Sequence, residues 1–106
     1  MLSIKINGKE HKLEVITVRK LNQTIAFKKK LAILEAQPQK DEEDIINAML
    51  EYIETIYSIK KGEEIIKPFT VEDILDSLPV NKLQSTFTDT LNGVMDAFSE
   101  EAEEKN

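Results

Sequence analysis

The chain has 106 residues, with 14 Lys plus Arg, 20 Asp plus Glu, a formal net charge of −6 and no cysteine. This length gives one small domain whose core covers about two-thirds of the surface that the unfolded chain exposes. The absence of cysteine excludes a disulfide scaffold and thiolate metal sites. No apolar run reaches the roughly 18 residues of a membrane span, and residues 1–6 lack the regions of a signal peptide, so we expect neither membrane binding nor secretion.

Charge is unevenly distributed along the chain. Residues 1–40 contain nine basic and three acidic side chains, whereas residues 41–106 contain five basic and seventeen acidic ones. The first part therefore carries a net charge of +6 and the second part a net charge of −12. Opposite charges on two parts of one chain favour association, either within one molecule or between copies.

Residues 2–15 are predicted to form a β-hairpin. Asn7-Gly8 lies between two segments of alternating apolar and polar residues, and both residues accept the positive φ angles of a two-residue turn. Such a turn pairs Ile6 with Lys9, Ile4 with His11 and Leu2 with Leu13. One face then holds Leu2, Ile4, Ile6, His11, Leu13 and Val15. A lone hairpin is only marginally stable, so this face is expected to pack against helices or another subunit.

Residues 18–36 are predicted to form a helix with Thr17 as its N-cap, because a threonine hydroxyl can accept a hydrogen bond from a free backbone N–H group. At about 100° per residue, this helix has two apolar stripes on nearly opposite sides. The first stripe is Val18, Leu21, Ile25 and Ala32, and the second is Phe27, Leu31 and Leu34. Either the helix is sandwiched inside its own domain, or one stripe is a docking surface.

Residues 42–60 are predicted to form the central helix, because apolar residues cover about half of its circumference. These residues are Ile45, Ile46, Met49, Leu50, Ile53, Ile56 and Tyr57. The acidic cluster at 41–44 suits the helix N-terminus, where the macrodipole favours negative charge. A calcium loop is the alternative, but its alternating acids, turn glycine and distal glutamate are missing. Lys60-Lys61-Gly62 is typical of a helix end.

Two further helices are expected, over about residues 71–77 and 80–98. Thr70-Val71-Glu72-Asp73 resembles a capping box at the start of the shorter helix, and Pro79 suits the first turn of the longer one. The longer helix has one apolar stripe, consisting of Val80, Leu83, Phe87, Leu91, Val94, Met95 and Phe98. Its opposite face is expected to be solvated and holds Gln84, Ser85, Thr86, Thr88, Asp89, Thr90 and Asn92.

Residues 99–106 contain four acids and one small apolar residue, and they are predicted to form an acidic, disordered tail. The fold class is therefore mainly α with a short N-terminal β-hairpin. We expect a small α+β domain of about four helices over residues 1–98.

The sequence offers little support for catalysis or cofactor binding. His11 is the single histidine, and no serine or threonine is tied to it in the context of a catalytic triad. The three glycines are too scattered for a phosphate-binding loop. Asp73 and Asp76 are interpreted as helix-surface charge, because no second carboxylate pair or histidine accompanies them. We therefore expect a protein that is not an enzyme and binds no cofactor, metal or small-molecule substrate.

Nucleic-acid binding is the main alternative from another class. It is favoured by basic residues on the first helix, which would contact phosphates: Arg19, Lys20, Lys28, Lys29 and Lys30. The net negative charge, the lack of a helix-turn-helix pattern and the lack of interleaved aromatic residues argue against it. Three consecutive lysines also spread over about 200° of a helix, so they do not form one stripe.

The order of the elements resembles that of a known family. An Ile4-Lys5-Ile6-Asn7-Gly8-Lys9 start, a basic helix, an apolar helix, the segment Phe69-Thr70-Val71-Glu72-Asp73-Ile74-Leu75-Asp76 and a final amphipathic helix are similar to the tail assembly chaperones of long-tailed bacteriophages infecting Gram-positive hosts. The resemblance covers about residues 2–98 and lies in layout and composition, with residues 69–76 as its most specific part. Ser77-Leu78 departs from the pattern, in which a glycine follows the acidic residue.

The resemblance implies a non-enzymatic protein in the cytoplasm of a bacterial host. Such a protein self-associates, coats the helical tape measure protein, and hands it over as the major tail protein polymerises around it. The family also implies a longer form made by a ribosomal frameshift. The basic front and acidic back of neighbouring copies would supply head-to-tail contacts.

A helix-in-groove contact through the second stripe would cover the tape measure protein. The candidate partner-binding residues are therefore Phe27, Leu31 and Leu34, with the neighbouring Lys28, Lys29 and Lys30. The alternative within the same class is a small adaptor of phage or bacterial origin that binds another protein through the exposed stripe.

Overall fold

The computed structural model describes the backbone of residues 2–104 and the side chains of residues 2–99. The elements follow in the order β1 (Leu2–Ile6), β2 (Lys9–Leu13), α1 (Val18–Ala36), α2 (Glu42–Tyr57), β3 (Ile59–Lys61), β4 (Glu64–Ile66), α3 (Val71–Ser77), the 3-10 helix η1 (Val80–Lys82) and α4 (Leu83–Glu104). The predicted α+β class, mainly helical with an N-terminal hairpin, is confirmed. Within residues 2–104, no helix has the length and apolar character needed to cross a membrane.

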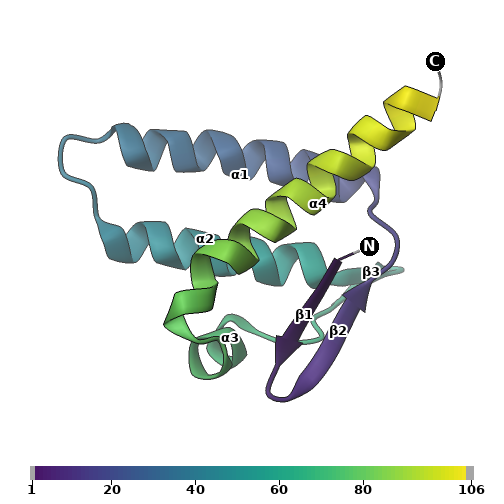
Figure 1. Ribbon diagram of the computed structural model, residues 1–106, viewed down its shortest axis with the longest axis horizontal. Coiled ribbons are helices and arrows are strands. Elements are labelled where there is room, and N and C mark those ends of the chain that lie inside the picture. The colour runs from purple at the N-terminus through teal and green to yellow at the C-terminus, as the bar shows by residue number, and fades with distance from the viewer. Residues whose placement is uncertain (1, 105–106) are drawn as a thin grey trace.

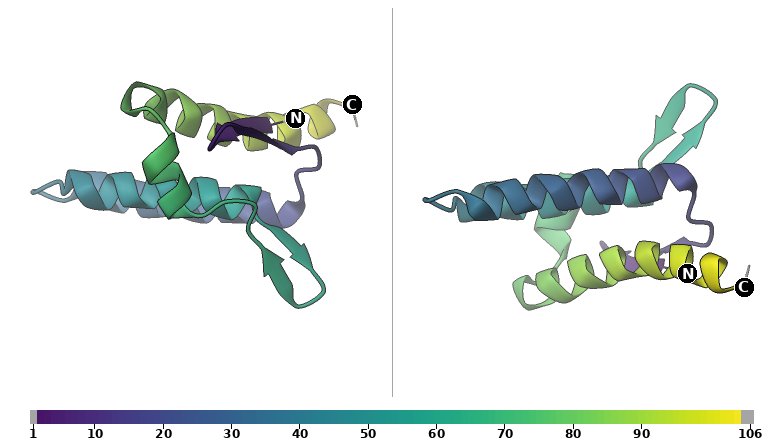
Figure 2. Two further views of the ribbon diagram at one scale, coloured as in Figure 1. Left: turned by 90° about the horizontal axis from the view of Figure 1, so that it is seen from below. Right: turned by 90° about the horizontal axis from the view of Figure 1, so that it is seen from above.

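The helices and strands form two layers. In one layer, α1 and α2 lie antiparallel and side by side, and in the other, α4 lies together with the β1–β2 hairpin (Figures 1 and 2). The short helix α3 lies between the two layers and leads the chain from one to the other (Figure 2). The β3–β4 hairpin projects from the α1–α2 layer on the side away from α4 (Figure 2). Within residues 2–104, one face of the two-helix layer is thus covered by α4, and the other carries only this small hairpin.

The first hairpin has the predicted register. Leu2 pairs with Leu13, Ile4 with His11 and Ile6 with Lys9, and the turn residues Asn7 and Gly8 have φ angles of 54° and 77°. The buried face consists of Leu2, Ile4, Ile6 and Leu13. Val15 was expected on the same face, but it lies beyond the end of β2 and is 70% exposed. The alternation therefore holds only as far as the strand pairing extends.

Side chains of α3 hold the hairpin turn in place. The backbone N–H of Asn7 donates to Oγ of Ser77 at 2.6 Å, and its Nδ2 donates to Oδ1 of Asp73 at 3.5 Å. Asp73 also completes the predicted capping box, because it accepts from the Thr70 N–H at 2.9 Å while Thr70 Oγ1 accepts from the Asp73 N–H at 3.3 Å. The capping box is confirmed, and the same aspartate links α3 to the first turn.

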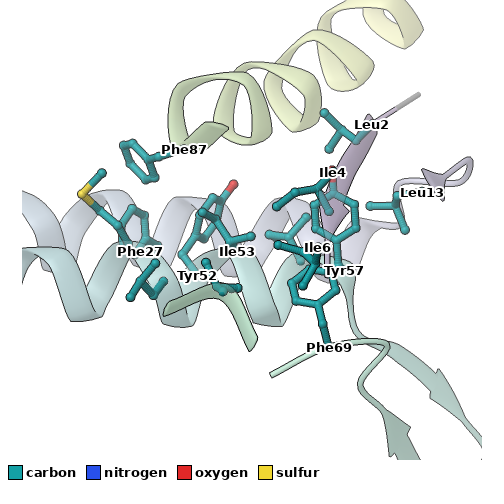
Figure 3. Packing of buried hydrophobic residues seen from close by; sticks show 14 of the residues in the cluster. Leu2, Ile4, Ile6, Leu13, Phe27, Tyr52, Ile53, Tyr57, Phe69 and Phe87 are labelled. Atoms are coloured by element: carbon teal, nitrogen blue, oxygen red, sulfur yellow. The ribbon is translucent and has the colours of Figure 1, made fainter. Parts of the chain in front are cut away.

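The central position of α2 is confirmed by its burial. Its buried residues are Ala48, Met49, Leu50, Tyr52, Ile53, Ile56 and Tyr57, whereas Ile46 is 39% exposed. Asp41 is the N-cap, and its Oδ1 accepts from the backbone N–H groups of Glu43 and Asp44. An aromatic cluster joins the layers: the Phe27 ring stacks on Tyr52 at 4.5 Å and lies edge-on to Phe87 at 5.5 Å (Figure 3).

The second hairpin was not predicted, and the expected end of α2 at residue 60 is wrong. The helix ends at Tyr57, where the hydroxyl of Ser58 donates to the Glu54 carbonyl at 2.7 Å. Lys60 and Lys61 lie in β3, and Gly62 occupies the first position of a turn with a φ angle of 62°. Type II′ turns require glycine at that position, so this glycine forms a hairpin turn and does not end a helix.

The last helix is longer than predicted. A 3-10 turn over Val80–Lys82 precedes α4, which continues through Glu104 into the segment that was expected to form the acidic tail. Glutamate is a good helix former, so a run of acids does not by itself end a helix. Residues 105 and 106 lie outside the described part of the chain.

The face of α4 that was expected to be solvated is partly buried. Thr90 is only 2% exposed, and its hydroxyl donates to the Thr86 carbonyl at 2.8 Å, so burial leaves it satisfied. One turn later, Gly93 lies against the Leu2 side chain of β1, where a Cβ atom would come within 2.2 Å of Leu2 Cδ2. The missing side chain at Gly93 lets β1 approach α4 closely.

Candidate partner-binding groove

The stripe that the sequence offers as a docking surface faces the core. Phe27 is 8% exposed and belongs to the aromatic cluster, while Leu31 and Leu34 are partly buried and pack against the core. The α1 helix therefore lies with its second stripe against α2 and α4, and of these three residues Phe27 is covered by its own domain while Leu31 and Leu34 are half-buried. Of the two readings of the helix, the docking stripe cannot be the one containing Phe27.

The neighbouring lysines are exposed, but they do not share one face. Lys28, Lys29 and Lys30 all lie on the surface of α1, and Lys30 Nζ is 3.9 Å from Oε2 of Glu51 on α2. An ion pair this exposed contributes little to stability. The three side chains remain available to a partner, and Lys29 belongs to the outward side of the helix, opposite Phe27.

The outward side of α1 carries the other predicted stripe. Val18 is 73% exposed and Ile25 is 41% exposed, and Ile33 on the same side is 64% exposed. Leu21, which was assigned to this stripe, instead packs partly against the core. The exposed apolar residues of α1 therefore lie opposite Phe27, Leu31 and Leu34, the apolar residues that were predicted to bind a partner.

A concave surface lies where the N-terminal part of α1 meets the β3–β4 hairpin. This hairpin groove has a volume of about 980 Å³. Its walls come from the end of β2, the start of α1, the end of α2 and both strands of the second hairpin. Three of the residues around it are apolar and exposed: Val15, Ile59 and Ile65, which are 70%, 46% and 66% exposed, with Ile59 and Ile65 on opposite faces of the hairpin. Large exposed apolar side chains close to a concave surface are typical of a protein interaction site.

The charged residues of the groove have both signs. Basic side chains are Lys12, Arg19, Lys20, Lys60 and Lys67, and acidic ones are Glu14, Glu54 and Glu63. The groove therefore combines exposed apolar residues with charged residues of both signs, and protein interfaces contain both kinds of residue.

Lys20 forms part of the groove floor and is the one buried charged side chain among residues 2–99. Its Nζ donates to the carbonyl oxygens of Ile56 at 2.7 Å and Ser58 at 2.6 Å, which are orphan acceptors at the C-terminus of α2. A cation at this end is stabilised by the helix macrodipole. Burial lowers the pKa of Lys20 from its usual value. This amine therefore fixes the position at which β3 begins, directly after the C-terminus of α2.

Glu54 fixes the other side of the hairpin base. Its Oε2 accepts from the backbone N–H of Val71 at 2.7 Å, and its Oε1 lies 3.0 Å from Nζ of Lys67. This carboxylate connects α2 to the segment that follows β4. Lys20 and Glu54 together position a hairpin whose own residues are all exposed.

The structure gives His11 a packing role. Its ring lies 5.1 Å from the Phe69 ring, and Phe69 also contacts the Tyr57 ring at 5.5 Å. Among the side chains that the structure describes, no three His, Asp or Glu residues are placed to hold a metal ion. The groove offers apolar contacts and charged side chains of both signs.

Comparison with family models, with curated proteins and with solved structures finds no match to this chain. The segment at 69–76, which carries the resemblance to tail assembly chaperones, has a structural role in this protein. Phe69 is buried, Thr70 and Asp73 form the capping box, and Ile74 is 1% exposed in the core. Its residues therefore explain how α3 starts and docks.

Sequence reasoning missed the groove because it missed the second hairpin. The signal was present at residues 59–66, where isoleucines lie on both sides of Gly62-Glu63. Two cations before a glycine favoured a helix end instead. With the turn assigned to Gly62, the exposed isoleucines of β3 and β4 would have been the candidate contact residues.

Proposed function

We propose that this protein is a non-enzymatic phage tail assembly chaperone, which coats the tape measure protein in the host cytoplasm until the major tail protein polymerises around it. The observation that carries the proposal is the hairpin groove, whose exposed apolar residues Val15, Ile59 and Ile65 have charged neighbours. A tape measure protein is a long amphipathic helix that aggregates unless its apolar stripe is covered. Apolar side chains at helical spacing on such a partner would enter the groove.

The order of the elements supports the proposal from a second side. The hairpin start at Ile4-Lys5-Ile6, the basic first helix and the final amphipathic helix follow the layout of the tail assembly chaperones. The exposed basic and acidic groups that line the groove suit a chaperone that must release its partner, because exposed ion pairs are weak and exchange readily.

The direct test begins with the genes that flank this one: the proposal predicts a major tail protein and, after it, a long helical tape measure protein, with which the chain is then co-expressed. The wild-type chain should raise the soluble fraction of the partner. The variant Val15→Glu/Ile65→Glu places two carboxylates on the apolar lining, so the soluble fraction should fall to the level without the chaperone. Both positions are exposed, so the fold should persist, and circular dichroism checks this.

A matched control uses exposed apolar residues away from the groove. Leu75 on α3 is 52% exposed and Val80 in η1 is 89% exposed, so Leu75→Glu/Val80→Glu should keep the wild-type effect. Equal loss in both double variants would remove the groove from the proposal. If the wild-type chain leaves the partner insoluble and no tail genes flank its gene, the adaptor alternative replaces the chaperone.

Nucleic-acid binding stays the alternative from another class. It predicts that the chain retards duplex DNA in a gel at physiological salt, and that Lys28→Glu/Lys29→Glu abolishes the shift. The chaperone proposal predicts no shift with either protein.

A further inference from the structure

We propose that the free edge of β1 binds an extended segment of a partner protein as a third strand, with a lysine or arginine of that segment beside Asp89. The segment would lie in a cleft of about 470 Å³, the β1 cleft, whose walls are β1 on one side and η1 with the first half of α4 on the other. The β1 cleft shares no lining residue with the hairpin groove. It would be a second binding site, and it goes beyond the proposed coating function.

The edge of β1 that faces away from β2 carries backbone groups without a strand partner. The β1–β2 sheet has two strands, and Ile6 and Lys9, which flank the two-residue turn, form a hydrogen-bonded pair. Such pairs alternate with non-bonded pairs along an antiparallel ladder, so the N–H and C=O groups of Ser3 and Lys5 point away from β2. Within residues 2–104, no other backbone group bonds to them. An exposed edge of this kind is a template for a further strand.

The direction of α4 leaves room beside this edge. At the start of β1 the two elements touch, because the Leu2 side chain lies against Gly93. Towards the hairpin turn they diverge (Figure 1), and the cleft opens between Gly8 at the turn and Lys82 before α4. A segment that entered the cleft would have the β1 backbone on one side and side chains of α4 on the other.

The floor of the β1 cleft holds a hydroxyl without a partner. Tyr57 lines the cleft beside Ile4 of β1 and is only 3% exposed, and its hydroxyl makes no hydrogen bond to any described residue (Figure 3). Every fully enclosed side-chain nitrogen or oxygen among the described residues has a partner, so this hydroxyl is open to the cleft. The Tyr52 hydroxyl, in contrast, lies 2.8 Å from Oγ1 of Thr24. Since buried hydroxyls are normally satisfied, the Tyr57 hydroxyl points to a ligand that supplies its partner.

Asp89 on the α4 wall supplies the charge that selects the segment. Its carboxylate is close to the Tyr57 hydroxyl, since burial and then the negative charge of Asp89 raise the pKa of Tyr57. Asp89 is exposed and forms no ion pair with any of the described side chains. A lysine or arginine of the segment could pair with this carboxylate and donate to the hydroxyl. Its apolar stem would pack on Ile4 and Leu78, which also line the cleft.

The outer face of β1 indicates which residue lies next to that base. Side chains alternate along a strand, so Lys5 points to the face opposite Ile4, where it lies across from Glu10. A segment residue opposite Lys5 would place its side chain on the same outer face, and an acid there is complementary. The segment residue opposite Ile4 points inward, towards the cleft floor. The matching pattern is therefore an inward base next to an outward acid.

The test uses a labelled peptide with blocked ends and the sequence Thr-Val-Glu-Lys-Glu-Val-Thr, in which the inward residues are valine and the central lysine. The purified full chain should bind it saturably in fluorescence anisotropy. Binding should slow hydrogen exchange, followed by NMR, at the amides of Ser3 and Lys5. The amides of Glu10 and Lys12, which point outward from the free edge of β2, should keep their exchange rates. A peptide that does not bind, or that protects the β2 edge instead, would overturn the proposal.

Two proline variants test the edge itself. Ser3→Pro removes an N–H group that points away from β2, so the hairpin ladder is kept, and the affinity for the peptide should fall at least about fivefold with the lost hydrogen bond. Lys12→Pro makes the same change at the residue directly across from Ser3, on the other edge, and should bind like the wild type. Circular dichroism checks the fold of both. Equal loss in the two variants would contradict binding at β1.

The charge is tested without altering the backbone. Asp89→Asn should lower the affinity for the lysine peptide about tenfold, as expected for the loss of a hydrogen bond to a charged group, and should not change the binding of a peptide with norleucine in place of lysine. Asp96 is an exposed acid on α4 outside the cleft, so Asp96→Asn is the matched control and should bind normally. An Asp89→Asn variant that binds like the wild type would overturn the proposal. The groove variant Val15→Glu/Ile65→Glu should still bind the peptide, which separates this site from the coating function.

Discussion

The two hairpins of this protein both have two-residue turns, but their strands have five residues in the first and three in the second, and they relate to the core in opposite ways. In β1–β2, four apolar residues on one face are buried, and α3 and α4 hold the hairpin from two sides. In β3–β4, all six strand residues are exposed, including Ile59, Ile65 and Ile66. The first hairpin is part of the core, whereas the second is only attached to it.

This difference shows that strand pairing and burial of apolar side chains contribute separately to the stability of a hairpin. A lone two-stranded hairpin is marginal in water, so β3–β4 must draw its stability from the groups at its base. These groups are the Lys20 amine on the end of α2 and the Glu54 carboxylate on Val71 and Lys67. An exposed hairpin fixed at its base keeps three isoleucines in contact with water, which suits binding better than folding.

The largest effect is expected from removing a buried isoleucine of the first hairpin. Ile6 is 1% exposed, so Ile6→Ala should lower the free energy of unfolding by about 3 kcal/mol, through lost burial and the cavity left behind. Urea denaturation measures this. The matched change Ile65→Ala in the second hairpin, at a residue 66% exposed, should alter it by less than about 0.5 kcal/mol. Equal effects would contradict the comparison.

The next largest effect is expected at the base of the second hairpin. Lys20→Met keeps the apolar stem but leaves the carbonyls of Ile56 and Ser58 without their donor, at a cost of about 2 kcal/mol. Hydrogen exchange should become faster in β3 and β4. The amides of β1 and β2 should be the least affected. Unchanged exchange in β3–β4 would mean that Lys20 does not position this hairpin.

A smaller effect with a diagnostic sign is expected where the first hairpin meets α4. Gly93→Ala gains about 1 kcal/mol of helix propensity, but its Cβ collides with Leu2, and overpacking costs about 1–3 kcal/mol. The single change should therefore be neutral to destabilising. In a Leu2→Ala background the collision is gone, so the same change should stabilise the protein. Thermal denaturation of all four proteins tests this reversal, and additive effects would contradict it.

The smallest effect is a pH dependence from the residue beneath the first hairpin. Burial, and then the negative charge of Asp89, raise the pKa of Tyr57 above its usual value of 10. The folded state thus holds this proton more tightly than the unfolded state, so the stability that it supplies is present below about pH 10 and is lost as the pH rises further. Tyr57→Phe should lose less stability than the wild type between about pH 10 and 12 in urea titrations. Parallel curves would contradict it.

Much of the fold followed from the sequence because local signals and burial agreed. Asn7-Gly8 fixed a register that every alternating residue of β1 supports, and the helix over 18–36 and the capping box at Thr70 were found for similar reasons. Thr17 shows the limit of such signals. It is the N-cap residue of α1, yet its hydroxyl makes no capping bond, so residue type alone did not fix the side-chain contact.

The candidate site was harder to predict because it depends on which face of α1 packs against the core. Two apolar stripes on one helix are equivalent in a periodicity analysis, and only the aromatic partners Tyr52 and Phe87 decide that Phe27 faces inward. The hairpin groove needs the meeting of the α1 start with residues 59–67, a long-range arrangement that no local pattern contains. The burial of Thr90 was also missed. Its hydroxyl is satisfied within its own helix, so this polar residue can be buried without a partner from another element.

The buried amine of Lys20 also makes the protein a chemical reporter of its own opening. Lys20 is 7% exposed and donates to two carbonyls, whereas every other lysine between residues 2 and 99 lies on the surface. An acylating reagent needs a free, unprotonated amine, so it modifies the surface lysines first and reaches Lys20 only when α1 separates from the end of α2. Acylation of this one side chain, followed by mass spectrometry, therefore measures how often the base of the second hairpin opens.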